Sequence, residues 1–392
     1  MSRCTFSTGK IFKQWAVWNK ELLYVGGFLA RAAYELEMQD IRVRWDASVA
    51  SNPGEPLNSE LRKGFYDKAR HNLQFFTFRE STPSAVVSSE MRSVFFSCVA
   101  QGQPFSIISN TGVGSALDVR MPDPAFSAFL KKLPIFPEEL LKSSKLIVAA
   151  LQERGMLRDI TFEDVLKELR ERSLSEEEMA ACLQWWIDTF RQDSAGIDDI
   201  RQQLLDAARL TVGPSDNGDE RIIPLKRIQT FLSPRNVVIP TDGPLPSHLL
   251  PISVSHKINS DQLQRSLRWR ELTVLEWIQH ISNPVVYQNS GFSIVESPIW
   301  AERVLQVLGR SWPTLSQTTK TSIVGLLNRL TCIPTSFGMK MPNKVYFSSA
   351  GIFQDLPIVK FPSGAPIKGS LQGMLADLGV RRYIDLEVIY NL

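Results

Sequence analysis

A short pattern recurs along this chain: an apolar run, turn-forming residues with a glycine, and a second apolar run. It lies within residues 105–122, within 332–347 and, in part, within 237–243. The pattern is typical of a β-hairpin, where glycine supplies the positive φ that the turn needs. We therefore predict a modular chain with structural turn glycines at Gly112, Gly338 and Gly243.

Helical periodicity and capping signals fill much of the remaining sequence. Apolar residues recur at helical spacing over residues 14–38, which predicts a long helix with one buried face that comprises Trp15, Trp18, Leu22, Val25, Phe28, Leu29, Ala32 and Leu36. Ser175 with Glu178 has the spacing of a capping box, in which each side chain satisfies an amide of the first helical turn. The same spacing recurs further along the chain, at Thr161 with Asp164 and at Thr273 with Glu276.

Helix, helix and hairpin follow one another twice, and this order resembles a winged-helix unit that has been duplicated. The first copy carries a polar insertion around residues 191–220. The predicted fold class is a helix-rich α+β chain of several modules with small hairpins. Residues 1–50 form the long helix, and 55–135 form an α+β module with its hairpin at 104–122. Winged-helix-like modules follow at 136–250 and at 255–392, the second including the C-terminal segment. Proline and glycine gather within 242–251, which predicts the seam between them.

Composition excludes several classes of protein. The net charge of +3 provides no strong basic field for nucleic acid. The four cysteines lie far apart, which argues against a zinc site or a disulfide framework and suits a reducing compartment. The longest apolar stretch near the start, residues 22–30, is too short to span a bilayer. We expect an intracellular protein, cytoplasmic or nuclear, that is not associated with a membrane. Residues 1–20 contain no acidic residue, which leaves a mitochondrial presequence as the less favoured alternative.

Motifs for catalysis are missing from the sequence. Gly9-Lys10 lacks the other residues of a phosphate-binding loop, and Gly112-Val-Gly114 lies in a predicted hairpin turn. No Gly-x-Ser-x-Gly elbow is present, and the four histidines have no metal-ligand spacing. We therefore expect no catalytic residue, no metal and no cofactor. An enzyme whose site follows no recognised pattern stays open as a third alternative.

One basic cluster is a candidate for nucleic-acid contact. Arg265, Arg268 and Arg270 surround Trp269. Phosphate binding requires several cations on one face. The predicted helix at 175–190, however, begins with three glutamates, and the one at 316–330 holds few cations. This disfavours nucleic-acid binding, which we keep as the alternative function.

Several segments, in the same order, carry a resemblance to a known family. These segments are Trp18–Glu35, Phe75–Ala85, Ile160–Leu169, Leu272–Trp277 and Ile333–Thr335. On them, the chain resembles large uncharacterised fungal proteins whose N-terminal module is similar to the Hsp90-type ATPases, as in sacsin and the plant NO VEIN protein. A domain of unknown function in that family corresponds to nearly all of this chain.

The resemblance implies an ATPase-coupled role without the nucleotide site. A site of the Hsp90 type needs an Asp-x-Gly-x-Gly segment, and none occurs here. By analogy the helix at 14–38 corresponds to the exit from the ATPase module, so we expect the ATP site to lie before Met1. The expected function is a non-catalytic scaffold, related to chaperones, whose partners are other proteins or an upstream ATPase module.

Overall fold

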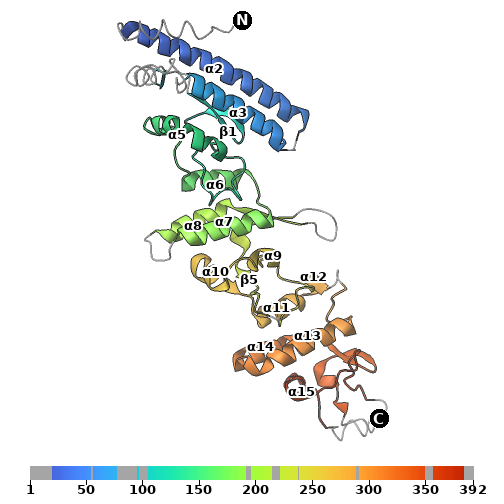
Figure 1. The fold of residues 1–392 in the computed structure, drawn as a ribbon. Coiled ribbons are helices and arrows are strands. Elements are labelled where there is room, and N and C mark those ends of the chain that lie inside the picture. Colours follow the sequence, from blue (N-terminus) through green and yellow to red (C-terminus); the bar gives the residue numbers. More distant parts are fainter. Residues whose placement is uncertain are drawn as a thin grey trace. The chain divides into compact units, whose positions relative to one another are not determined.

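Helices make up most of the described chain, and its strands pair in twos (Figure 1). The computed structural model describes residues 20–53, 56–76, 95–96, 105–190, 196–213, 221–236, 238–287, 291–348 and 356–383. Clustering of contacts divides the chain into two units, Met1–Arg172 and Ser173–Leu392. The predicted helix-rich α+β fold is confirmed.

The first unit is built on a long helix, α2, which packs against α3 and a hairpin. This helix extends beyond the predicted end at residue 38, whereas the predicted start at residue 14 lies outside the described residues. The elements of the unit are α2 (Lys20–Ser51), α3 (Ser59–Phe76), β1 (Ser106–Ser109), β2 (Gly112–Ser115), α5 (Glu138–Gln152) and α6 (Phe162–Glu171).

One face of α2 provides much of the core of this unit, but it is not the predicted face, since Val25, Phe28, Leu29 and Leu36 are exposed. Tyr34, Met38 and Trp45 recur at helical spacing and are almost fully buried. The Tyr34 hydroxyl donates a hydrogen bond to the carbonyl of Ser106 (2.7 Å), and the amide of Ser106 donates to the Glu35 carboxylate (3.2 Å). Apolar packing and two hydrogen bonds therefore fix β1 to α2.

The second unit alternates helix pairs with short strands. Its helices are α7 (Glu176–Thr189), α8 (Ile197–Ala207), α9 (Ile252–Ser255), α10 (Ser260–Leu267), α11 (Val274–Ile281), α12 (Pro284–Tyr287), α13 (Pro298–Ser311), α14 (Gln317–Leu327) and α15 (Gly369–Asp377). Its strands are β3 (Arg209–Val212), β4 (Arg221–Pro224), β5 (Thr230–Phe231), β6 (Arg270–Glu271), β7 (Ile333–Thr335) and β8 (Gly338–Lys340). Single 3₁₀ turns occur at η1 (Leu225–Arg227), η2 (Trp312–Thr314) and η3 (Pro342–Lys344).

Three helices begin with the capping boxes that the sequence predicts. In α6, α7 and α11 the hydroxyl before the helix accepts the amide of the third helical residue, whose carboxylate accepts the amide of the capping residue. These reciprocal bonds satisfy two amides that the helix itself leaves without partners. The boxes therefore fix where each helix starts.

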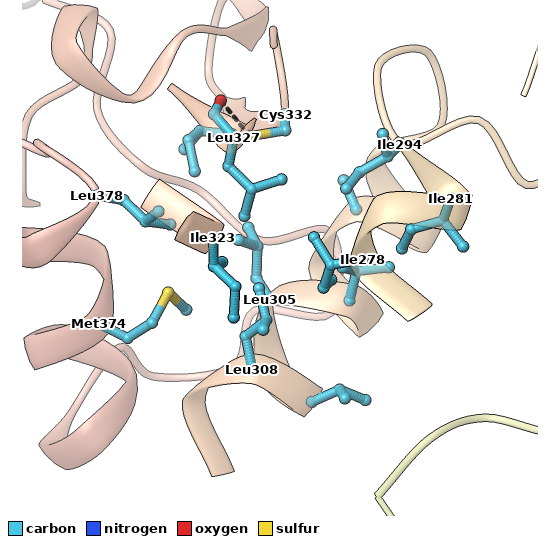
Figure 2. Close-up of a cluster of buried hydrophobic side chains, with 14 of the residues drawn as sticks. Ile278, Ile281, Ile294, Leu305, Leu308, Ile323, Leu327, Cys332, Met374 and Leu378 are labelled. Atoms are coloured by element: carbon cyan, nitrogen blue, oxygen red, sulfur yellow. Dashed lines mark hydrogen bonds between the residues drawn. The ribbon is translucent and has the colours of Figure 1, made fainter. Parts of the chain in front are cut away.

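One hydrophobic core of the second unit joins α11, α13, α14 and α15 (Figure 2). Leu305 and Leu308 of α13 lie among buried isoleucines and leucines from the neighbouring helices, with Met374 of α15 at one side (Figure 2). Cys332 lies at the edge of this cluster, and its thiol donates to the carbonyl of Leu327 (3.7 Å). Burial raises the pKa of the Cys332 thiol to about 12.

The hairpins confirm two of the three predicted turn glycines and correct the third. Gly112 begins β2 with φ 122°, and Gly338 begins β8 with φ 82°. Residues 238–243 form bends and turns, with no strand, and Gly243 does not have a positive φ. A Cβ atom on Gly243 would instead lie 2.2 Å from the ring of Trp300. This glycine therefore permits close packing and makes no hairpin turn.

The hairpin of this region lies earlier, where the sequence suggested only a polar insertion. Helix α8 runs directly into β3, which pairs with β4 in antiparallel register from Arg209 with Pro224 to Val212 with Arg221. The order helix, helix, hairpin is thus found at α7, α8 and β3–β4, and again at α13, α14 and β7–β8.

The boundary between the two units falls after Arg172, inside the predicted 136–250 module. The predicted seam at 242–251 lies within the second unit, where Arg303 forms two hydrogen bonds with Asp242 and the Leu250 amide donates to Thr230. The predicted module limits stay predictions. No helix among the described residues has the length and apolar character needed to cross a bilayer.

Candidate functional site

One local arrangement, here called the three-segment motif, occurs three times in the described chain. A central residue pairs in parallel with a second segment and with a third segment, and no two of the three are adjacent in sequence. The central residues are Arg120, Thr230 and Tyr346. Their partners are Ile135 and Arg158, Leu249 and Arg270, and Ile358 and Arg381, respectively.

The hydrogen bonds of the three copies share one register. In each copy, the carbonyl of the central residue accepts a hydrogen bond from the second segment. The donor is the amide of the residue that directly follows the paired one. These bonds are Phe136 to Arg120 at 2.8 Å, Leu250 to Thr230 at 2.8 Å, and Val359 to Tyr346 at 2.9 Å. Parallel pairing requires a connection that crosses back along the strands. No α-helix lies between a central residue and its second segment in the described residues; the helices lie between the second and third segments, namely α5, then α9 with α10, and then α15.

The motif also has the same neighbours along the chain. A hairpin precedes each central residue: β1–β2, β3–β4 and β7–β8. A residue with positive φ precedes each third segment: Leu157 (48°), Arg268 (56°) and Gly379 (100°). Arg268 and Gly379 lie at the C-terminal ends of α10 and α15, where left-handed residues commonly end a helix, whereas Leu157 lies beyond Gln152, the end of α5. The chain therefore repeats one structural plan, at nearly equal intervals.

A salt bridge joins the first motif to the capping-box helix that follows it. The Arg120 guanidinium holds both oxygens of Asp164, at 2.9 and 3.0 Å, and both side chains are largely buried. Burial alone would raise the pKa of Asp164, but Arg120 and Thr161 hold it below its ordinary value. The carboxylate of the capping box therefore has a second role in tertiary packing.

The second motif makes the same connection with an arginine from its third segment. Arg270 lies 2.8 Å from Glu276, the capping-box residue of α11, and remains exposed. In the third motif, Arg381 lies over the ring of Tyr346, 5.8 Å from its centroid. Arg158, Arg270 and Arg381 thus occupy equivalent positions.

The three arginines that are candidates for nucleic-acid binding do not share their contacts in the structure. Arg268 ends α10 and binds Asp198 of α8 at 2.6 Å, whereas Arg270 binds Glu276. Arg265 is exposed on α10 and has no ion pair within the described part of the chain. Trp269 between them is buried. Two of the three charges are thus already paired, and nucleic-acid binding stays a prediction.

Two equivalent contacts hold the loop between the central and second segments against the capping-box helix. In the first unit, buried Glu168 lies one turn after Asp164 and accepts the amides of Lys131, Lys132 and Leu133, at 2.5, 2.9 and 2.8 Å. Arg172 also donates to it, at 2.8 Å. Burial alone would raise the pKa of Glu168, but these donors lower it. We call this contact the glutamate clamp.

In the second unit, a histidine takes the place of that glutamate. His280 lies one turn after Glu276 and interacts with the backbone of Leu245, which precedes the second segment as Lys131 does in the first unit. Burial and the neighbouring His248 lower the pKa of His280, and the bond to Leu245 opposes them. Sequence reasoning predicted no role for His280. We call this contact the histidine clamp.

A polar cleft of about 350 Å³ lies beside the second motif. Its walls include Ser233, Arg235, Asn236, Ser260, Asp261 and Gln264. The Ser260 hydroxyl donates to that of Ser233 (3.1 Å), and Asn236 donates to Glu271 (3.3 Å). These bonds fix the loop after Thr230. No group of three or more histidine, cysteine or acidic side chains within the described ranges has a metal-binding arrangement.

Comparison with known proteins places the chain in a family. Neither the curated proteins nor the solved structures gave a match. A family model described as a protein of unknown function, DUF3684, matches residues 12–392. Nearly all of the chain is covered, including the three motifs and both clamps, so the chain belongs to the DUF3684 family.

Proposed function

We propose that this chain is a non-catalytic scaffold that couples an Hsp90-type ATPase module to other proteins, in a chaperone-related cycle. The proposal combines the repeated architecture with the resemblance to the fungal, sacsin-like and NO VEIN-like proteins. It assigns the chain to the region after the ATPase module, inside the cell. The chemistry would belong to that module, and this chain would transmit its state.

The observation that carries the proposal is the threefold use of one motif. Chains built from repeated units bury their apolar faces between neighbours and present extended surfaces to partners. Here the hydrogen bonds of Arg120, Asp164 and Glu168 join parts of the first unit to one another. Such contacts favour a structural role over a catalytic one.

The outer face of α2 supplies a surface for the ATPase module. Val25, Phe28, Leu29 and Leu36 recur at helical spacing on this face, and Leu36 is 73% exposed. None of the four is charged, and together they form an apolar stripe of the kind that marks protein contacts. The resemblance assigns this helix to the exit from the ATPase module, so we assign the stripe to that module.

Titration calorimetry between the full chain and the ATPase module of a longer family member tests the proposal. We expect binding, and we expect Leu29→Glu with Leu36→Glu to weaken it at least tenfold, about 1.4 kcal/mol. Ile299→Glu is the matched control, since Ile299 is equally exposed, at 73%, in the second unit. Absence of binding by the wild-type chain, or equal loss in the control, would contradict the proposal.

The alternative function is nucleic-acid binding by winged-helix-like units. The observations that favour it are the two helix–helix–hairpin arrangements and the exposed Arg265. Fluorescence anisotropy with duplex DNA and single-stranded RNA at low salt distinguishes the two functions. Affinity that falls steeply with salt and is lost in Arg265→Ala with Arg268→Ala would favour the alternative.

A further inference from the structure

The outer face of α2 carries apolar residues that are seven positions apart. Leu29, Leu36 and Val43 are exposed by 58%, 73% and 58%, and exposed Ala50 continues the series near the end of the helix. Seven residues make almost two turns of an α-helix, so these side chains lie along one line. Leu36 lies two residues after buried Tyr34, about 200° around the helix, which places the line opposite the core. We call these four exposed residues the α2 seam.

The seam has the composition of a contact between helices. Exposed Ala32 and Ala47 lie beside its larger residues, and small side chains at these positions let a second helix approach closely. The described elements that pack against α2 are α3, β1 and β2, and they leave the seam exposed. Residues 29–50 span about 32 Å of helix. Apolar residues at this spacing, continued over this length, form the pattern along which two helices pair.

The sizes of the seam residues favour a second copy of α2 in antiparallel orientation. Leucines occupy the N-terminal half of the seam, and valine and alanine occupy the C-terminal half. When two copies run antiparallel and cross near residues 39 and 40, Leu36 of each copy faces Val43 of the other, and Leu29 faces Ala50. Large residues then meet small ones along the whole contact, which fills the space evenly. A parallel pair would instead place leucine on leucine at one end and alanine on alanine at the other.

The charges beside the seam suit the same pairing. Glu37 and Arg44 lie seven residues apart on one side of the seam, with the acid in the N-terminal half and the base in the C-terminal half. In a symmetric antiparallel pair, Glu37 of each copy therefore faces Arg44 of the other, and the contact occurs twice. Glu37 is exposed and has no ion pair within the part of the chain that the structure describes.

The residues at the crossing point are compatible with this arrangement. Arg44 donates to Asp40 of its own helix at 3.1 Å, and a guanidinium carries five N–H donors, enough to bind a second carboxylate. Asp40 also accepts from Lys68 of α3 at 2.6 Å, so its charge is compensated where the copies meet. Gln39 is exposed beside it. Because an amide side chain both donates and accepts, the two copies of Gln39 satisfy each other.

We propose that this chain forms a homodimer through antiparallel pairing of α2 along the seam, with two Glu37–Arg44 ion pairs across the contact. The seam shares Leu29 and Leu36 with the stripe that the proposed function assigns to the ATPase module. The dimer therefore covers that surface, and the module binds the monomer. The dimer itself does not depend on the proposed function, whereas its competition with the module rests on it.

Sedimentation velocity of the full chain over a range of concentrations tests the dimer. A single helix pair belongs to the small, transient interfaces, below about 1,200 Å², so we expect a dissociation constant of roughly 10–100 µM. The sedimentation coefficient should rise with concentration to that of a dimer and stop there, because an antiparallel pair closes on itself. A monomer well above these concentrations, or continued growth into larger oligomers, would overturn the proposal.

Two charge reversals test the orientation of the pair. Glu37→Arg and Arg44→Glu each bring like charges together twice in the contact, and each should weaken the dimer about tenfold. In a mixture of the two variants, both contacts again join opposite charges, so a heterodimer should form with about the wild-type affinity. Wild-type affinity in both single variants, or failure of the mixture to associate, would overturn the proposal.

Arg310→Glu is the control, since exposed Arg310 lies on α13 of the second unit and its reversal changes the net charge as Arg44→Glu does. Its dimer should have the wild-type affinity, and an equal weakening would overturn the assignment to α2. Arg44→Glu should also bind the ATPase module more tightly than the wild-type chain does, because no second copy competes for the seam. Equal binding would overturn the competition. Failure of the module to bind either chain would contradict the proposed function, while sedimentation decides on the dimer.

Discussion

The glutamate clamp and the histidine clamp hold equivalent loops with opposite chemistry. In the first unit the helix presents a carboxylate that accepts three backbone amides, and in the second it presents an imidazole that interacts with the backbone of Leu245. Every peptide group carries both a donor and an acceptor. A small change in the path of the loop is therefore enough for a different kind of side chain on the helix to hold its backbone. The comparison teaches that the repeated plan lies in the backbone, whereas side chains at matching positions differ in charge and in pH response.

Removing the glutamate clamp should have the largest effect. Glu168→Ala leaves three amides and Arg172 without their carboxylate, and should lower the free energy of unfolding of the first unit by about 3–5 kcal/mol. His280→Ala, its counterpart, removes no comparable set of hydrogen bonds and should cost only about 1 kcal/mol. Urea unfolding followed by tryptophan fluorescence measures both. Glu171→Ala, an exposed neighbour on α6, serves as the control; a loss as large as that of Glu168→Ala would contradict the clamp.

The contact between Gly243 and Trp300, on which the loop of the second unit packs, offers the next test. Gly243→Ala places a Cβ atom 2.2 Å from the buried ring of Trp300 and should destabilise the second unit by up to about 3 kcal/mol. Gly325→Ala in α14 meets nothing within 4 Å and should be neutral or stabilising by about 0.5–1 kcal/mol. Thermal unfolding compares the pair. Equal melting temperatures would show that the loop moves away from Trp300 at little cost.

The two hairpin glycines sharpen the comparison of the units. Both have positive φ, but a Cβ atom on Gly112 also meets the Trp45 ring at 3.0 Å, whereas Gly338 has open space. Gly338→Val should cost about 1 kcal/mol for the backbone alone, and Gly112→Val about 2 kcal/mol. Chemical denaturation of each variant gives the difference. A larger loss at Gly338 would refute the role of Trp45.

The smallest effects should come from the arginines that join each motif to its capping-box helix. Arg120→Ala removes a largely buried pair with two hydrogen bonds and should cost about 1–2 kcal/mol. Arg270 is 68% exposed, so Arg270→Ala should change stability by less than about 0.5 kcal/mol. Differential scanning calorimetry resolves the two units. Equal effects would mean that burial does not set the strength of this connection.

Features encoded within a few residues could be predicted from the sequence. The hairpins at Gly112 and Gly338 and the three capping boxes depend on neighbouring residues alone, and the structure has them as predicted. Helix α8 was missed because Asp198 and Asp199 begin a stretch whose polar residues suggested an insertion. Its buried Leu204 and Leu205 are the signal that could have identified it.

The three-segment motif could not be predicted, because each copy pairs single residues that are far apart in sequence. Arg120 and Tyr346 each follow a valine at the same distance from the hairpin glycine, but this spacing does not identify their pairing partners, and Thr230 does not follow a valine. The role of Gly243 was likewise hidden, since its partner, Trp300, lies on another helix. The arginines at 265, 268 and 270 appeared as a cluster because sequence proximity conceals their separate carboxylate partners.

The burial of Cys332 makes the rate of its alkylation a measure of how often the second unit opens. Thiols react as thiolates, and a thiol with a pKa of about 12 is almost entirely protonated at neutral pH. Cys182 is also buried, and it lies in the same unit. An alkylating reagent therefore modifies these two positions only when the unit opens, and mass spectrometry separates them from Cys4 and Cys98. The rate at which Cys332 is modified then counts the openings of this core in the unmodified protein, without a dye or a substitution.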